Sequence, residues 1–299
     1  MYEYTDEIIN YLVKILKKYE RIDIHNENKK IDFETCIKMA QEFLDEIKID
    51  INIEKILNEQ SLVFRTEFDG YKSDGVSSYD EEKNRKIVSV NKTEDIKMVA
   101  VIVHELLHYY NQPEDNNRAM ASDFLTEVIS YAYELILLNK YLESEYGAEA
   151  KDMITLVFRT LMYRTNLIYT PVCSIKYYKS KKLTVEGISS DGKIEIYLRD
   201  MKEFISKNYT ISEELWNTIG YHLGIYCYIE YKKDPNFIYK LSKLNDSINI
   251  KSFMECIKII GLNDINELYE KGMTNLEKYI ELIKSYQEEK NTEKKLNLK

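Results

Sequence analysis

The stretch that decides the fold is VIVHELLHYY, residues 101–110, together with DFLTEVISYAYE, residues 123–134. His104 and His108 are four residues apart, so on a helix their imidazoles lie one turn apart and can meet one metal ion. Glu105 projects beside that ion, where its carboxylate can take a proton from a water molecule that the metal activates. We therefore predict that His104 and His108 bind zinc and that Glu105 is a general base.

The residues around this motif independently predict a helix. Thr93 is the expected N-cap, and Glu94 and Asp95 place negative charge at the positive end of the helix dipole. Pro113 is expected to end the helix. Apolar residues recur between these limits at helical spacing, at Ile96, Val99, Ala100, Val103, Leu107 and Tyr110. The alternative is a buried helix whose two histidines only satisfy local hydrogen bonds.

A catalytic zinc site needs a third protein ligand and an open fourth position. Two patterns compete for that ligand. In one, it follows six residues after His108, at Glu114, with Asn111 where a turn-forming glycine is usual. In the other, Glu127 returns to the metal from the next helix, which we expect from about residue 122 to 140. Two further carboxylates are the fall-back ligands, Asp123 and Glu134.

The segments VIVHELLH and TEVISY together resemble the gluzincin metallopeptidases, and the second is similar to the NEAISD helix of the thermolysin-like family. The resemblance covers about forty residues, from roughly 94 to 135. It implies that Glu127 joins His104 and His108 as the third ligand. In the thermolysin-like family an Asp four residues after that Glu orients a zinc histidine. This chain has Tyr131 there, so the tyrosine hydroxyl or another carboxylate, such as Asp123, would take that role.

The resemblance also implies features outside the two helices. A donor from a downstream helical region stabilises the developing oxyanion in gluzincins. Tyr221 and His222, in IGYHLGIY, are our candidates, and packing in the core is the alternative for both. An edge strand would bind the peptide backbone by strand addition. KIVSV, residues 86–90, is the candidate for this strand, with an inner strand as the alternative.

The fold class that we predict is α+β and mostly helical, with a zincin-like catalytic core. Residues 1–145 would hold a small sheet and the zinc-binding helices, and residues 146–299 a mainly helical region that closes the cleft. Strands are expected at 61–68, 75–80 and 86–90, and a hairpin at 181–198 with its turn at Asp191-Gly192. Periodicity predicts the other helices at 5–20, 33–47, 149–166 and within 211–287.

Composition excludes several classes of protein. The chain has 299 residues and a net charge of -9 with both signs interleaved, which argues against a nucleic-acid partner. It has no apolar run of membrane-spanning length and no secretory signal pattern, so we expect a cytoplasmic protein that does not bind membranes. The cysteines are scattered without a CxxC pair, which predicts reduced thiols at Cys36, Cys173, Cys227 and Cys256.

These observations lead to one functional expectation. The chain would be a peptidase with one zinc ion that hydrolyses a peptide or protein substrate. The alternative is a regulatory or non-catalytic zinc-binding protein of the same fold, for example an intracellular protease that cleaves a repressor, or a protein-binding module. The sequence leaves cleavage specificity and oligomeric state open.

Overall fold

The computed structural model describes residues 29–66, 74–80, 82–112, 120–180 and 211–297. The elements in these ranges are α2 (Phe33–Glu46), α3 (Ile53–Asn58), β1 (Leu62–Arg65), β2 (Gly75–Asp80), β3 (Arg85–Asn91), α4 (Ile96–Asn111), α5 (Met120–Lys140), α6 (Gly147–Ser180), α8 (Ile211–Lys233), a short 3₁₀ helix η2 (Pro235–Phe237), α9 (Ile238–Asn245), α10 (Phe253–Ile259) and α11 (Ile265–Asn297). The described part of the chain is therefore mostly helical with one small sheet, as predicted. The helix expected at 5–20 and the hairpin expected at 181–198 lie outside the described residues.

The sheet has the order β1-β3-β2. β3 pairs in parallel with β1, where Val88 lies opposite Leu62, and antiparallel with β2, where Val88 lies opposite Ser77. The prediction that residues 86–90 form an edge strand is therefore wrong. Val88 and Val90 are fully buried, so this strand packs in the core while both of its backbone edges are already paired. The outer strands are β1 and β2.

The motif helix α4 begins later than expected. Its N-cap is Asp95, whose Oδ1 accepts a hydrogen bond from the Met98 N–H at 3.0 Å, so the prediction of Thr93 as the cap is wrong. Glu94 has a φ of 53°, which turns the chain just before the helix. Thr93 instead donates its hydroxyl to Asp95 at 2.6 Å. We had expected Asp95 only to interact with the helix dipole, and it is instead the residue that caps the helix.

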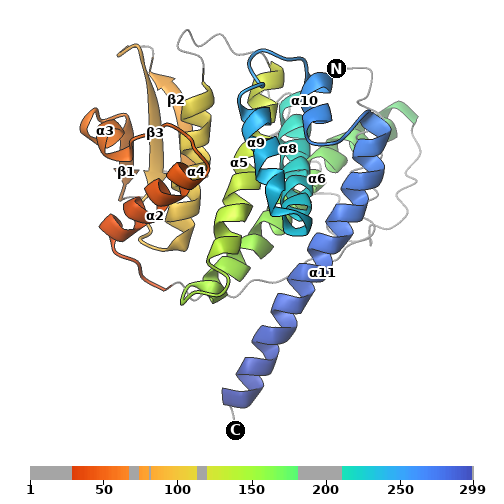
Figure 1. The fold of residues 1–299 in the computed structure, drawn as a ribbon. Coiled ribbons are helices and arrows are strands. Elements are labelled where there is room, and N and C mark those ends of the chain that lie inside the picture. Colours follow the sequence, from red (N-terminus) through yellow and green to blue (C-terminus); the bar gives the residue numbers. More distant parts are fainter. Residues whose placement is uncertain (1–28, 67–73, 81, 113–119, 181–210, 298–299) are drawn as a thin grey trace. The chain divides into compact units, whose positions relative to one another are not determined.

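The far end of α4 is tied to the C-terminal half of the chain. The Asn111 amide donates to the Leu107 carbonyl at 2.9 Å and to the Asn245 side chain in α9 at 2.8 Å. In Figure 1, α4 lies between the sheet and α5, and it contacts β2, β3 and α2 as well as α5. Burial on all these sides explains why most of its side chains are apolar.

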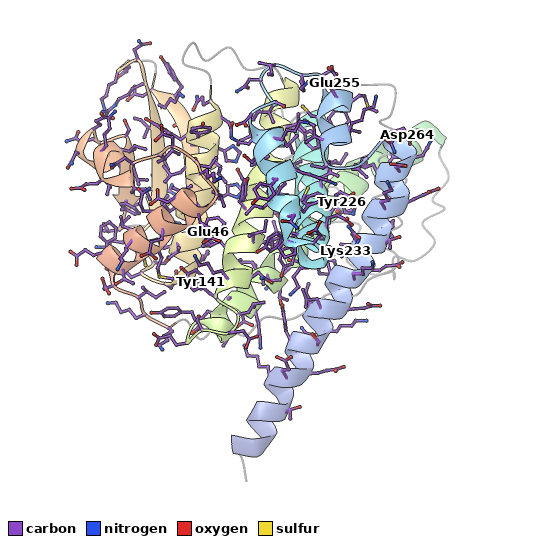
Figure 2. The ribbon with its side chains drawn as sticks, viewed as in Figure 1. Glu46, Tyr141, Tyr226, Lys233, Glu255 and Asp264 are labelled. Atoms are coloured by element: carbon purple, nitrogen blue, oxygen red, sulfur yellow. The ribbon has the colours of Figure 1, made fainter. Side chains whose placement is uncertain are left out.

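The C-terminal helices are joined by side chains that satisfy backbone groups. Tyr279 of α11 donates to the Ile154 carbonyl of α6 at 2.5 Å. Tyr226 of α8, labelled in Figure 2, donates to the Ile260 carbonyl at 3.3 Å. Glu255, also labelled there, completes a capping box with Ser252 at the start of α10. These bonds tie α6, α8, α10 and α11 to the backbone groups around them.

The chain divides into two compact units. One contains residues 1–23 and 158–219, and the other contains residues 24–157 and 220–299. The division into domains at residue 145 stays a prediction. No helix among the described residues is long and apolar enough to cross a membrane. Three cysteines in the described part are buried free thiols, namely Cys36, Cys227 and Cys256.

Candidate metal and catalytic site

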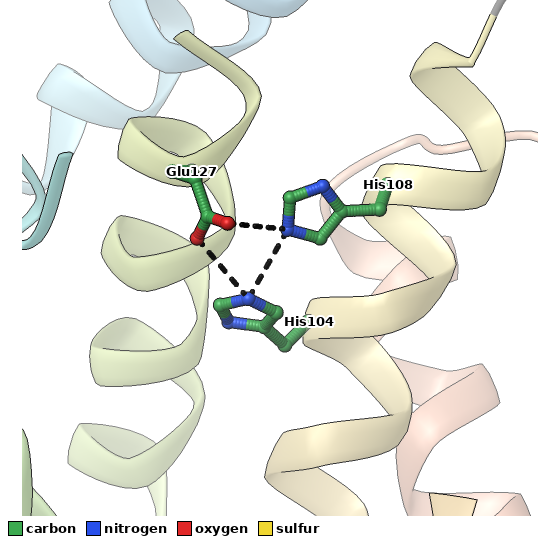
Figure 3. A group of neighbouring side chains, drawn as sticks. All are labelled: His104, His108 and Glu127. Carbon is green, nitrogen blue, oxygen red and sulfur yellow. Dashed lines mark hydrogen bonds and ion pairs between the residues drawn. The ribbon is translucent and has the colours of Figure 1, made fainter. Parts of the chain in front are cut away.

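Three side chains from α4 and α5 converge in the second unit. His104 and His108 lie one turn apart on α4, and Glu127 faces them from α5 (Figure 3). The two Nε2 atoms are 3.2 Å apart. The Glu127 carboxylate places one oxygen 3.6 Å from Nε2 of His104 and the other 3.7 Å from Nε2 of His108. The structure thus brings together the three residues that the sequence proposed as metal ligands.

This triangle fits a zinc ion. Two ligand atoms that each lie about 2.1 Å from a tetrahedral zinc are about 3.4 Å apart. The three measured separations, from 3.2 to 3.7 Å, are close to that value. Two imidazole nitrogens and one carboxylate oxygen are also a ligand set of catalytic zinc. Both histidines are buried, whereas Glu127 is 23% exposed, so the cluster can be reached from its glutamate side.

A second carboxylate of α5 lies behind the first histidine. Nδ1 of His104 donates to Glu134 Oε2 at 3.0 Å. With a cation bound, a carboxylate that accepts from the Nδ1–H keeps the tautomer whose Nε2 lone pair points into the cluster. Ser130, between the two glutamates, donates its hydroxyl to the His104 carbonyl at 3.3 Å. Glu134 therefore orients His104. The sequence had suggested Tyr131 or Asp123 for this role, and Glu134 only as a fall-back ligand.

Tyr131 contacts the same histidine differently. Its ring packs edge-on against the His104 ring with centroids 4.6 Å apart. Its other face stacks on Tyr221 of α8, with centroids 3.7 Å apart. Burial, followed by the charges of Tyr221, Glu127 and Glu134, raises the pKa of Tyr131 well above the ordinary value of a tyrosine. Tyr131 thus stays a neutral hydroxyl that contacts both α8 and His104 of α4.

The two residues proposed as oxyanion donors lie in different surroundings. Tyr221 stacks on Tyr131, which in turn packs against the His104 ring. His222 is fully buried and bonds to the backbone of Gly272 in α11. Burial lowers the pKa of His222 to about 4, so its ring is neutral at pH 7. Residues 220 and 224 face α5, and residue 222 is about 200° around the helix from both of them.

Glu105 is buried between α4 and the sheet. Burial raises the pKa of its carboxyl above the usual value, which suits a proton acceptor better than a fully solvated carboxylate. A Cβ on Gly75, the first residue of β2, would lie 2.5 Å from Glu105 Cγ. The outer strand β2 therefore runs directly past the candidate base, a neighbour that no pattern in the sequence indicated.

The carboxylates and imidazoles of the cluster shift one another's pKa values. Burial alone would lower the pKa of His104, but the carboxylates of Glu127 and Glu134 outweigh it and raise this pKa to about 10. Burial likewise would raise the pKa of Glu127, but the imidazoles of His108 and His104 lower it below its ordinary value. The carboxylates around His104 thus stabilise positive charge at this point, as a cation site requires.

The remaining candidates are placed as follows. Glu114 lies outside the described residues, and the side chain of Asp123 is not described. The spacing pattern that used Glu114 stays untested for that reason. Among the described side chains, one group of three or more histidine, cysteine and acidic residues has metal-ligand geometry, and it is the group of His104, His108 and Glu127.

Comparison with solved structures finds proteins of the same fold. One described as oligoendopeptidase F from Bacillus anthracis has a TM-score of 0.64 at 14% identity, over 95% of this chain and 56% of that one. Another described as oligoendopeptidase F has a TM-score of 0.61 at 10% identity, over 95% and 57%. PZ peptidase A, determined with an inhibitor, has a TM-score of 0.60 at 12% identity, over 93% and 56%. The sequence matches no protein-family model and no curated protein sequence.

These likenesses confirm the predicted fold class, a mostly helical α+β protein with a zincin-like core. At 10–14% identity they show the fold alone. The chain spans little more than half the length of each of these structures.

Proposed function

We propose that this chain is a zinc-dependent peptidase that cleaves peptide bonds with Glu105 as its general base. The observation that carries the proposal is the triangle of His104, His108 and Glu127, whose separations suit zinc. The buried carboxylate of Glu105 lies beside it on α4. The fold shared with structures described as oligoendopeptidase F and PZ peptidase supports the same reaction class. Peptides are accordingly the proposed substrates.

Each residue has a distinct role in this proposal. His104 and His108 would hold the ion through Nε2, and Glu127 would hold it through its carboxylate. When bound, zinc polarises a carbonyl and makes water a stronger nucleophile at neutral pH. Glu105 takes the proton from the attacking water and passes it to the leaving amine. Glu134 keeps the His104 ring in the orientation that leaves Nε2 available.

The peptide backbone would bind along β2. This strand is at the edge of the sheet, and its first residue lies against Glu105. An extended substrate can add to such an edge by main-chain hydrogen bonds, which also brings its backbone alongside the base. β2 therefore replaces β3 in the role that the sequence analysis gave to residues 86–90.

Tyr221 remains our candidate for the oxyanion donor, and Tyr131 separates its ring from that of His104. Its ring is held by the stack on Tyr131. His222 would contribute through packing, because its ring bonds to the backbone of α11. A Tyr221→Phe variant keeps the stacked ring and removes only the hydroxyl.

The proposal is tested with purified protein, elemental analysis and a library of quenched fluorescent peptides. One equivalent of zinc and hydrolysis of some peptides are expected of the wild-type chain. Glu105→Gln removes the base but no ligand, so it should keep the zinc and lose about a hundredfold or more of the rate. Absence of zinc from the wild-type chain would overturn the proposal. Zinc without hydrolysis of any peptide would favour a zinc-binding protein without turnover.

A further inference from the structure

Gly75 has no room for a side chain. A Cβ at this position would lie 2.5 Å from Glu105 Cγ, 2.8 Å from Glu105 Oε1 and 2.6 Å from Val101 Cγ1. Carbon atoms in contact are normally about 3.5–4.0 Å apart. Any residue other than glycine would thus displace Glu105, Val101 or the strand itself.

The backbone does not demand glycine here. Gly75 is paired with Val90 in the antiparallel ladder, and Gly261 is the one glycine with a positive φ among the described residues. An alanine could adopt this strand conformation without strain. The requirement at position 75 is therefore one of space next to Glu105.

The geometry points to Gly75 as a positioning residue for the general base. The strand is held by its pairing with β3, and α4 is buried against the sheet, so neither backbone yields easily. The Glu105 side chain, with its three rotatable bonds, is the part that moves when a methyl group is added at position 75. The bare backbone of Gly75 thus keeps the carboxylate where the proposed peptidase reaction needs it. The catalytic consequence rests on the proposed function.

The same displacement spares the metal ligands. A Cβ at position 75 has its three nearest neighbours in Glu105 and Val101, and none of them belongs to His104, His108 or Glu127. Zinc affinity should accordingly be unchanged in Gly75→Ala, whereas kcat should fall by about 10- to 100-fold, as expected for a reacting group displaced by roughly an ångström. A general loss of folding would instead lower both quantities.

Two double variants separate positioning from folding. In a Glu105→Gln background, Gly75→Ala should cause no further loss of rate, because the group that it displaces is no longer a base. Val101→Ala removes the Cγ1 methyl group that would lie 2.6 Å from the new Cβ, so the added methyl group fits with a smaller displacement of Glu105. Gly75→Ala with Val101→Ala should therefore recover part of the lost kcat.

The decisive measurements are kcat, zinc affinity by competition with a chelator, and a crystal structure of zinc-loaded Gly75→Ala. A displaced Glu105 carboxylate with unmoved histidines supports the inference. Wild-type kcat in Gly75→Ala, an equal loss in the Glu105→Gln background, or an unmoved Glu105 would overturn it. If Gly75→Ala does not fold, the double variant with Val101→Ala is compared with Val101→Ala alone, and a lower kcat with the same zinc affinity supports the inference. Lack of hydrolysis by the zinc-loaded wild-type chain defeats the proposed function instead, and the crystal structure still decides the position of Glu105.

Discussion

At the scale of single residues, Glu134 and Glu127 act on opposite nitrogens of one imidazole. They are seven residues apart, which is two helical turns, so both point from α5 toward α4. Glu127 faces Nε2 of His104 and Glu134 bonds to Nδ1. A search at a spacing of seven would have found Glu134 in the sequence, whereas the spacing of four taken from the thermolysin-like family led to Tyr131. The role belongs to the carboxylate because it is the stronger acceptor for the imidazole N–H.

The buried, neutral His222 should make the stability of the folded chain depend on pH. Its folded-state pKa is about 4, against an ordinary value of 6.5, so the unfolded chain binds more protons between these values. Its contribution to stability is intact above about pH 6.5 and is lost as the pH falls toward 4, by about 3 kcal/mol in all. We expect the free energy of unfolding in urea to fall less between pH 7 and pH 5 in His222→Asn than in the wild-type chain.

The comparison between the two proteins isolates this residue, because every other titrating group is common to both. Equal slopes of stability against pH would show that His222 is not buried in its neutral form. The experiment is best done without metal, so that zinc release at low pH does not enter the difference.

At the scale of elements, α8 positions α5 through two glycines. A Cβ on Gly220 would lie 2.8 Å from Glu127 Cβ, and one on Gly224 would lie 2.5 Å from Tyr131 Cβ. The two helices therefore approach closely at Glu127, the proposed third ligand. Both glycines lie in IGYHLGIY, and the structure shows that α5 is the helix that they face.

Gly220→Ala tests this arrangement. The added methyl should push α5 and its Glu127 away from the histidines, and zinc affinity should fall by about tenfold, a size typical of changes just outside a ligand shell. Competition with a chromophoric chelator measures it. Gly224→Ala is the matched control. Its added methyl group crowds the same contact between α8 and α5 one turn away, against Tyr131 and not against a proposed ligand. Equal losses of zinc affinity in both variants would mean that only general packing is involved.

At the scale of the whole molecule, zinc would join α4 and α5, two consecutive helices of the second unit that pack on different elements. α4 also packs on the sheet, and its last residue Asn111 is bonded to Asn245 in α9. A ligand that binds only the folded state stabilises it by about 2.7 kcal/mol when its free concentration is a hundred times its Kd. We therefore expect a chelator to lower the melting temperature of the zinc-loaded chain and added zinc to restore it.

The control for that measurement is His108→Ala, which removes one ligand and should make the melting temperature insensitive to both additions. A melting temperature of the wild-type chain that does not respond to zinc would contradict the proposed site. The same scans show whether one transition or several report on the two compact units.

The sequence by itself determined the local features. Helical and alternating periodicities predicted α2, α4, α5 and the three strands, and the spacing of four within α4 predicted the pair of histidines, because these patterns depend on neighbours along the chain. Tertiary structure decided the rest. It placed β3 at the centre of the sheet. It also brought together two pairs of residues that are distant in sequence, His104 with Glu134 and Gly75 with Glu105. Such contacts arise from how the elements pack, and no local periodicity encodes that.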